Sequence, residues 1–226
     1  MLQVCGYSGV YLICTANGEQ RMQIEYSEMM KWIRHNHPDH IDRWMDSLHP
    51  NQIKCKQWLV DSLNKVQIPQ DNNDKFRIEI IGGWYGYPLI DLLYKNFGTY
   101  IREIDIFEID EFACKVINKY KQLFEHWNVR IFHQDYFTYQ EKRRTHLIIN
   151  TSCEHMWDMS TNKECYESPE RTLLALQSNN FFTLPEHINC VNTGQELAKQ
   201  ADVKELHGDK LKFEEYTRFM ILGKWK

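Results

Sequence analysis

The sequence predicts an α/β protein with a doubly wound, mainly parallel, Rossmann-like sheet of seven strands and an N-terminal helical cap. Its 226 residues, 42% hydrophobic and 26% charged, have the composition of a globular protein large enough for a substantial core. Before the polar loop 67–74 apolar residues recur at helical spacing, whereas after it short apolar segments alternate with helix-like segments of about 10 to 15 residues. Such alternation forms right-handed βαβ units and therefore a mainly parallel sheet.

The polar loop divides the chain into an N-terminal extension, residues 1–70, and a sheet domain, residues 71–226. Residues 2–14 are apolar and β-branched, which indicates a short hairpin. Pro38 interrupts the helical pattern that follows, and Pro50 opens a second helix. We expect this extension to cap the sheet.

The sheet domain contains seven segments that are typical of strands. The segment 194–202 is helix-like, and a charged stretch after it is predicted to be a loop. The final strand is expected to lie antiparallel beside its neighbour, which fits the count of seven. The predicted strands are 77–83, 101–110, 129–137, 146–152, 172–179, 187–191 and 216–225.

Charge and cysteine content disfavour several classes of protein. The net charge of −4 supplies no basic excess to neutralise phosphates, so nucleic-acid binding is disfavoured, although a local basic patch stays open. The seven cysteines are scattered without a Cys-x-x-Cys pair, which predicts neither a disulfide framework nor a zinc knuckle. No signal segment and no apolar run of about 20 residues is found. We therefore expect a soluble, cytoplasmic protein without a membrane segment, and the oligomeric state stays open.

A glycine-rich turn, Gly82-Gly83-Trp84-Tyr85-Gly86, follows the first predicted strand of the sheet. Ligands of open parallel sheets bind at the carboxyl ends of the strands. Glycines at that point let the backbone turn tightly and approach a ligand closely. The pattern is not Gly-x-Gly-x-x-Gly, so a dinucleotide pyrophosphate site is poorly supported.

Acidic residues end the next two predicted strands. Glu108 can accept hydrogen bonds from both hydroxyls of a ribose, while Asp110 either caps the following helix or makes a second contact. Asp135 can accept the exocyclic amine of an adenine, with Tyr136 beside the ring, or it is a solvated loop residue. Because the tips of parallel strands meet at one edge of the sheet, the three tips together indicate a nucleoside ligand more strongly than any one alone.

These motifs, with Leu147-Ile148-Ile149-Asn150 after them, resemble the ordered motifs of class I S-adenosylmethionine-dependent methyltransferases over residues 75–226. The chain also resembles a poorly characterised methyltransferase-like group of bacteria and their tailed phages, in the segments NTSCEHM, QSNNFF, EHINCV and YTRFMILG. The resemblance implies S-adenosylmethionine as the cofactor. It implies contacts from Gly82, Gly83, Trp84 and Gly86 to the methionine part, from Glu108 and Ile109 to the ribose, from Asp135 and Tyr136 to the adenine, and from Asn150 at the tip facing the substrate.

One position departs from the family pattern. The family often has an acid two residues before the first glycine, where this chain has Ile80, and Glu79 would point to the opposite side of the strand. The Ile-Ile-Gly-Gly form also looks like aminopropyltransferases that use decarboxylated S-adenosylmethionine. Those enzymes carry an acid inside the glycine turn, where this chain has Trp84-Tyr85, so polyamine synthesis is the weaker interpretation.

Polar and ionisable residues crowd the segment after the fourth predicted strand. Asn150 can orient an amine or amide, and Glu154 and His155 can take a proton from an attacking nucleophile, so these three are the catalytic candidates. A loop ion pair between Glu154 and His155 is the alternative. A zinc site from Cys153, His155 and Cys165 matches no common spacing, so no metal ligand is predicted.

Two further groups remain candidates for the pocket. A second polar cluster after the fifth predicted strand, including Asn179, Asn180 and His187, either forms a turn or lines the pocket opposite Asn150. Four residues of the extension are placed to reach the methionine carboxylate: Lys54, Lys56, Gln57 and Trp58.

The sequence therefore predicts a methyltransferase acting on an unidentified small-molecule or polar side-chain acceptor. The alternatives are another S-adenosylmethionine-consuming enzyme, by aminopropyl transfer or cofactor cleavage, and a non-catalytic binding domain on the same fold. A DNA amino-methyltransferase is disfavoured by the charge and because Thr151-Ser152-Cys153 follow Asn150 where that family has two prolines and an aromatic.

Overall fold

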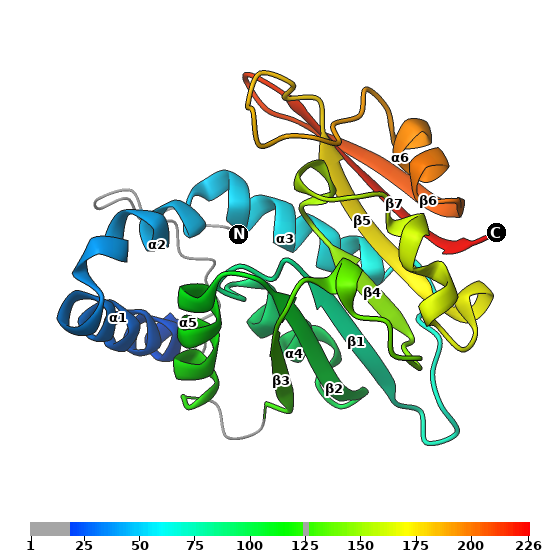
Figure 1. The fold of residues 1–226 in the computed structure, drawn as a ribbon. Coiled ribbons are helices and arrows are strands. Elements are labelled where there is room, and N and C mark those ends of the chain that lie inside the picture. Colours follow the sequence, from blue (N-terminus) through cyan, green and yellow to red (C-terminus); the bar gives the residue numbers. More distant parts are fainter. Residues whose placement is uncertain (1–18, 124–126) are drawn as a thin grey trace.

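A computed structural model describes residues 19–123 and 127–226, which form one seven-stranded sheet flanked by helices (Figure 1). The strand order is β3-β2-β1-β4-β5-β7-β6. Neighbours from β3 to β5 are parallel, and β7 is antiparallel to both β5 and β6. The strands are β1 (Phe76–Ile81), β2 (Ile101–Glu108), β3 (Val129–His133), β4 (Leu147–Asn150), β5 (Leu173–Asn179), β6 (Val203–Lys212) and β7 (Thr217–Trp225). This confirms the predicted doubly wound, mainly parallel sheet with an antiparallel final strand.

α-Helices alternate with the strands from β1 to β3, whereas only 3-10 helices lie between β3, β4 and β5. Short 3-10 helices lie at Pro38–His40, Tyr136–Thr138, Cys153–His155, Met159–Cys165 and Pro169–Arg171. The α-helices are α1 (Glu19–Asn36), α2 (Ile41–Ser47), α3 (Pro50–Leu63), α4 (Leu89–Phe97), α5 (Glu111–Lys121) and α6 (Gly194–Gln200). None of these described helices combines the length and the apolar character that a membrane crossing requires.

The sixth strand differs from the prediction. Residues 187–191 lie in the connection after β5, and the sixth strand is β6, in the stretch predicted to be a charged loop. Most of the β6 side chains are exposed, and β6 is an edge strand that pairs only with β7. Charged residues are typical of such edges, where they oppose pairing with other chains, so the strand has no apolar run. The hairpin predicted at 2–14 lies outside the described residues.

The sheet separates two hydrophobic cores. Ile78, Ile80 and Ile104 pack on one face with buried residues of α1–α5, including Trp44 and Leu59 of the N-terminal helices. The other face packs against α6 and the segments after β4. Figure 1 shows α1 and α2 beside α5, and the ring of His40 stacks on Phe112 at this junction, 3.9 Å between centroids. The helices of the N-terminal extension thus share a core with the sheet.

Candidate functional site

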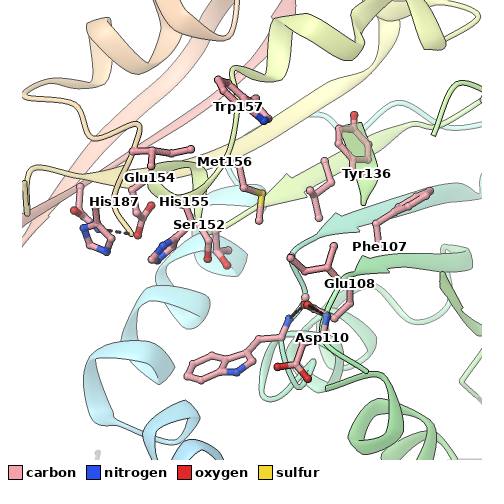
Figure 2. Close-up of a pocket in the computed structure, with 18 of the residues that line it drawn as sticks. Phe107, Glu108, Asp110, Tyr136, Ser152, Glu154, His155, Met156, Trp157 and His187 are labelled. Carbon is pink, nitrogen blue, oxygen red and sulfur yellow. Dashed lines mark hydrogen bonds between the residues drawn. The ribbon is translucent and has the colours of Figure 1, made fainter. Parts of the chain in front are cut away.

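A cavity of about 720 Å³ lies at the carboxyl ends of the parallel strands, where residues of α2 and α3 meet the strand tips (Figure 2). Its two ends have different composition. The glycine-turn end contains the turn after β1 with Glu108, Asp110 and residues 134–137, and the histidine end contains Glu154, His155, His187 and Arg218. Figure 2 shows Glu108 and Asp110 on one side of this space and the two histidines on the other.

The glycine turn, residues 82–86, depends on glycine at the point nearest the cavity. Gly82 has φ +62, and a Cβ atom there would lie 2.2 Å from Cε of Met156. A Cβ on Gly83 would lie 2.6 Å from Ile106. Gly86, with φ +73, packs against Ile90 in the core, so it closes the turn instead of facing the cavity. Gly82 and Gly83 line the cavity, and glycine is required at each because a Cβ atom would enter space held by Met156 or Ile106.

Trp84 couples this turn to Glu108. Its φ of +46 is in the left-handed region, which costs a non-glycine residue about 1–2 kcal/mol. In this conformation its N–H donates to Oε2 of Glu108 at 2.7 Å, while Oε1 accepts from the Asp110 N–H at 2.9 Å. Glu108 is only 7% exposed, and burial raises its pKa although these N–H bonds oppose the rise. A carboxylate has about four lone-pair positions, so these bonds leave acceptor capacity for a ligand.

Asp110 has the capping role foreseen as an alternative. It accepts from the Ala113 N–H at 2.9 Å at the start of α5, and it pairs with Arg43 of α2 at 2.6 Å. Burial alone would raise its pKa, but the bonds from Ala113 and Arg43 outweigh burial and lower it. The ion pair connects α2 to the start of α5 beside the cavity. No sequence signal pointed to Arg43, because it lies 67 residues from Asp110 in the chain.

The tip of β3 lines the same end of the cavity. Asp135 is exposed and caps the short helix after it by accepting from the Phe137 N–H at 2.9 Å. Tyr136 also lines the cavity, although it is buried and its hydroxyl is 2.7 Å from the Tyr166 hydroxyl. Ile109, at 70% exposed, presents an apolar surface there.

Asn150 has a different position from the one expected. Its side chain is fully buried, its Oδ1 accepts from the Ser152 N–H at 2.9 Å, and its Nδ2 lies 3.4 Å from the sulfurs of Met156 and Met159. The amide therefore holds the turn after β4, and Asn150 is not among the residues that line the cavity. Its neighbours Thr151 and Ser152 line the space instead, so we correct the expectation of a direct catalytic or cofactor contact.

Glu154 forms a buried charge pair at the histidine end. It is 1% exposed, and its Oε1 accepts from Nδ2 of Asn179 and from Nη2 of Arg218, each at 2.7 Å. Its Oε2 is buried and has no hydrogen-bond partner among the described residues. The cation that pairs with Glu154 is Arg218 of β7, so the loop ion pair between Glu154 and His155 that was considered does not form.

Two histidines flank this carboxylate. Nδ1 of His155 lies 3.2 Å from the Glu186 carbonyl oxygen, and Nδ1 of His187 lies 2.7 Å from the Phe181 carbonyl oxygen. The two rings are 4.5 Å apart between centroids. One ligand atom each of Glu154, His155 and His187 lies within 4.8 Å of the others. The structure thus assembles a group suited to a metal where none was expected, and neither Cys153 nor Cys165 belongs to it.

Among the four residues of the extension that were considered, Lys56 is the one that lines the cavity. Its ammonium lies 2.5 Å from Oε1 of Gln52, and burial, followed by the charge of Arg218, lowers its pKa to about 8. Trp58 instead donates to Asp209 at 3.0 Å, and Lys54 lies over the Phe213 ring.

Ile80 stands where the methyltransferase family often has an acid, and it lies away from the cavity. Ile80 packs in the core, whereas Glu79 is buried on the other face of β1 with Arg143 at 3.7 Å and Tyr166 at 2.5 Å. Burial raises the pKa of Glu79 although Arg143 opposes the rise. The opposite orientation of these two side chains agrees with the strand alternation.

The fold is that of class I S-adenosylmethionine-dependent methyltransferases. The N-methyltransferase NodS from Bradyrhizobium japonicum WM9 is 11% identical with a TM-score of 0.57, covering 79% of this chain and 98% of that one. A putative sarcosine dimethylglycine methyltransferase from Galdieria sulphuraria is 12% identical with a TM-score of 0.56, covering 76% and 85%. A variant of MtNAS in complex with S-adenosylmethionine is 10% identical with a TM-score of 0.55, covering 92% and 74%. No protein-family model and no curated protein matches the sequence.

Proposed function

We propose that this chain is a methyltransferase that moves the methyl group of S-adenosylmethionine to a small-molecule or polar side-chain acceptor. The observation that carries the proposal is the buried Glu108 carboxylate at the tip of β2, held by two backbone N–H groups beside the glycine turn. This arrangement offers ionic acceptors to a ribose at the edge of the sheet where such ligands bind. The fold, which the two methyltransferases named above share, supports the general reaction class and leaves the acceptor unidentified.

The cofactor occupies the glycine-turn end in this proposal. The ribose hydroxyls donate to the remaining lone pairs of Glu108, and the adenine lies between the apolar surface of Ile109 and residues 134–137. The methionine part passes along the backbone at Gly82 and Gly83, which line the cavity. The carboxylate of that part has two arginines in reach of the same cavity, Arg43 and Arg218.

The acceptor occupies the histidine end and faces the sulfonium methyl. Its nucleophilic lone pair forms the new bond to the methyl carbon, the methyl–sulfur bond breaks with its electrons passing to sulfur, and the proton of the acceptor passes to a base. Positioning supplies most of the rate enhancement for such a displacement. Glu154, His155 and Lys56 line this end, and the lowered pKa of Lys56 leaves neutral amine near physiological pH.

Calorimetric titration with S-adenosylmethionine and its demethylated product tests the proposal. We expect binding by the wild type and a loss of about 10- to 100-fold in Glu108→Gln, because the substitution keeps the shape but removes the charge-assisted bonds to the ribose. Glu111→Gln is the matched control, since Glu111 is an exposed neighbour paired with Lys115.

The same samples separate the alternatives. Equal affinity of both Glu108→Gln and wild type for either ligand contradicts the proposed site. Tighter binding of decarboxylated S-adenosylmethionine favours aminopropyl transfer, and binding without turnover in a labelled-methyl screen favours a non-catalytic domain.

A further inference from the structure

The histidine end of the cavity contains three side chains of types that bind transition metals. Glu154, His155 and His187 each offer one ligand atom, and these atoms lie within 4.8 Å of one another. Figure 2 shows the three residues gathered on one side of the cavity, away from Glu108. Two imidazoles and one carboxylate form a donor set that binds zinc or ferrous iron, with positions left open for a substrate.

The unpaired oxygen of Glu154 is a second observation that points to a cation at this place. Its Oε1 receives both hydrogen bonds, from Asn179 and Arg218, while Oε2 is buried without a partner in the described part of the chain. An ionised carboxylate oxygen without a partner in the protein interior is costly. A cation beside Oε2 supplies the interaction that the protein does not.

The histidines are oriented in the way that metal ligands commonly are. Each ring has its Nδ1 at hydrogen-bond distance from a backbone carbonyl oxygen, that of Glu186 for His155 and that of Phe181 for His187. A carbonyl oxygen only accepts, so each Nδ1 acts as the donor and each Nε2 is the ring nitrogen left to bind a metal. The two carbonyl bonds also fix the orientation of both rings.

Hydrogen bonds connect the two segments that carry these ligands. The Asn189 N–H donates to the Glu154 carbonyl oxygen at 2.9 Å, and the Asn189 side chain donates to the Met156 carbonyl oxygen at 3.1 Å. The turn after β4 and the connection after β5 are thereby fixed to one another. Such outer contacts hold ligands in place before the metal arrives.

We propose that Glu154, His155 and His187 bind one first-row divalent transition-metal ion, with zinc as the reference ion. Three protein ligands leave at least one position open toward the cavity. If the proposed methyltransferase function holds, that position takes the nucleophilic oxygen, nitrogen or sulfur of the acceptor and favours its deprotonated form. Glu154 and His155 then serve as ligands, and Lys56 remains to receive the proton.

Metal binding is measured directly, without reference to activity. Chelator-treated full-length protein is titrated with Zn²⁺ by calorimetry and with Co²⁺ by visible absorption, with Mg²⁺ as a comparison. We expect one ion per chain for Zn²⁺ and Co²⁺, weaker binding of Mg²⁺, and at least about a 100-fold loss of affinity in His155→Ala and in His187→Ala. Glu186→Gln is the matched control, because it changes an exposed side chain beside His187 and keeps the backbone carbonyl.

Unchanged Zn²⁺ affinity in both histidine variants overturns the proposal, since binding then occurs at other surface groups. Absence of binding to the wild type overturns it as well. The cofactor titrations on the same samples keep the two proposals distinct. Glu108→Gln is expected to lose S-adenosylmethionine and keep Zn²⁺, whereas His187→Ala is expected to lose Zn²⁺ and keep S-adenosylmethionine.

Discussion

The buried carboxylate at the glycine-turn end of the cavity accepts from backbone N–H groups, whereas the buried carboxylate at the histidine end accepts from side chains. Glu108 accepts from the N–H groups of Trp84 and Asp110, all within one stretch of strand tips. Glu154 depends on Asn179 and Arg218, which come from two other strands. Backbone contacts at the first end persist through most substitutions, while the second end can change its chemistry by exchanging side chains.

This difference matches the proposal that the glycine-turn end binds the cofactor and the histidine end binds the acceptor. S-adenosylmethionine is the same molecule in every enzyme that uses it, so its site can be built from turn geometry and one acid. An acceptor differs from enzyme to enzyme, and its site requires a particular set of polar groups. The two ends should therefore respond differently to substitution, in stability as well as in binding.

The largest effect is expected from Arg218→Met, at the histidine end. Removing this cation leaves the Glu154 carboxylate buried with its charge uncompensated, which should lower the free energy of unfolding by about 3–5 kcal/mol. Urea denaturation in the presence of a chelator measures this. Adding Glu154→Gln to the same chain should recover part of the loss, because the uncompensated charge is removed.

Arg130→Met is the control for that experiment. Arg130 makes a two-bond pair with Asp105, but it is half exposed, so less than about 1 kcal/mol should be lost. Equal losses in the two arginine variants would show that the buried pair is worth no more than an exposed one, and the contrast between the ends would fail.

A smaller effect is expected from Gly82→Ala, at the glycine-turn end. The positive φ costs alanine about 1–2 kcal/mol, and the new methyl group must displace Cε of Met156. We expect this loss in the free energy of unfolding together with weaker S-adenosylmethionine binding by calorimetry. Gly194→Ala is the control, since its Cβ would meet Ile221 at an ordinary 3.7 Å. Similar stability and affinity in both variants would argue against a required glycine at position 82.

The smallest effect concerns pH and Lys56. Its pKa is lowered from 10.5 to about 8 in the folded protein, so between these values the unfolded chain binds a proton that the folded chain does not. The free energy of unfolding then rises with pH in this window. Relative to Lys56→Met, the wild type should gain about 1–2 kcal/mol between pH 8 and pH 10, a value reduced by partial solvation.

Urea denaturation of both proteins at the two pH values tests this, because other titrating groups cancel in the difference. Parallel pH dependence in wild type and Lys56→Met would mean that the Lys56 amine keeps an ordinary pKa. It would then be a poor proton acceptor for the histidine end.

The glycine-turn end was largely predictable from sequence, and the histidine end was not. Gly82, Gly83 and Glu108 follow directly from where apolar strands end, and a helix cap was one of the two roles considered for Asp110. Asn150 also ends a strand, but its amide points inward to the sulfurs of Met156 and Met159. Strand position does not decide which way a side chain turns after the strand ends, so this candidate was misplaced.

His187 and Arg218 show a different limit. His187 was one polar residue among several in a cluster, and nothing in its neighbours indicated that it would meet His155. Arg218 lies 64 residues from Glu154, on a strand whose neighbour was predicted in the wrong place. The exposed, charged β6 has no apolar periodicity, and it forms because the β7 backbone offers it hydrogen bonds.

The sequence by itself determined the fold class, the glycine turn and the acid at the tip of β2. The reason is that apolar periodicity is a local property of the sequence. The alternation of strands and helices that it indicates produces a parallel sheet, and the strand tips of a parallel sheet lie at one edge. Only the tertiary structure decided the sixth strand, the inward turn of Asn150 and the grouping of Glu154, His155 and His187. These features depend on how buried polar groups find partners from distant segments, and that is decided when the segments pack together.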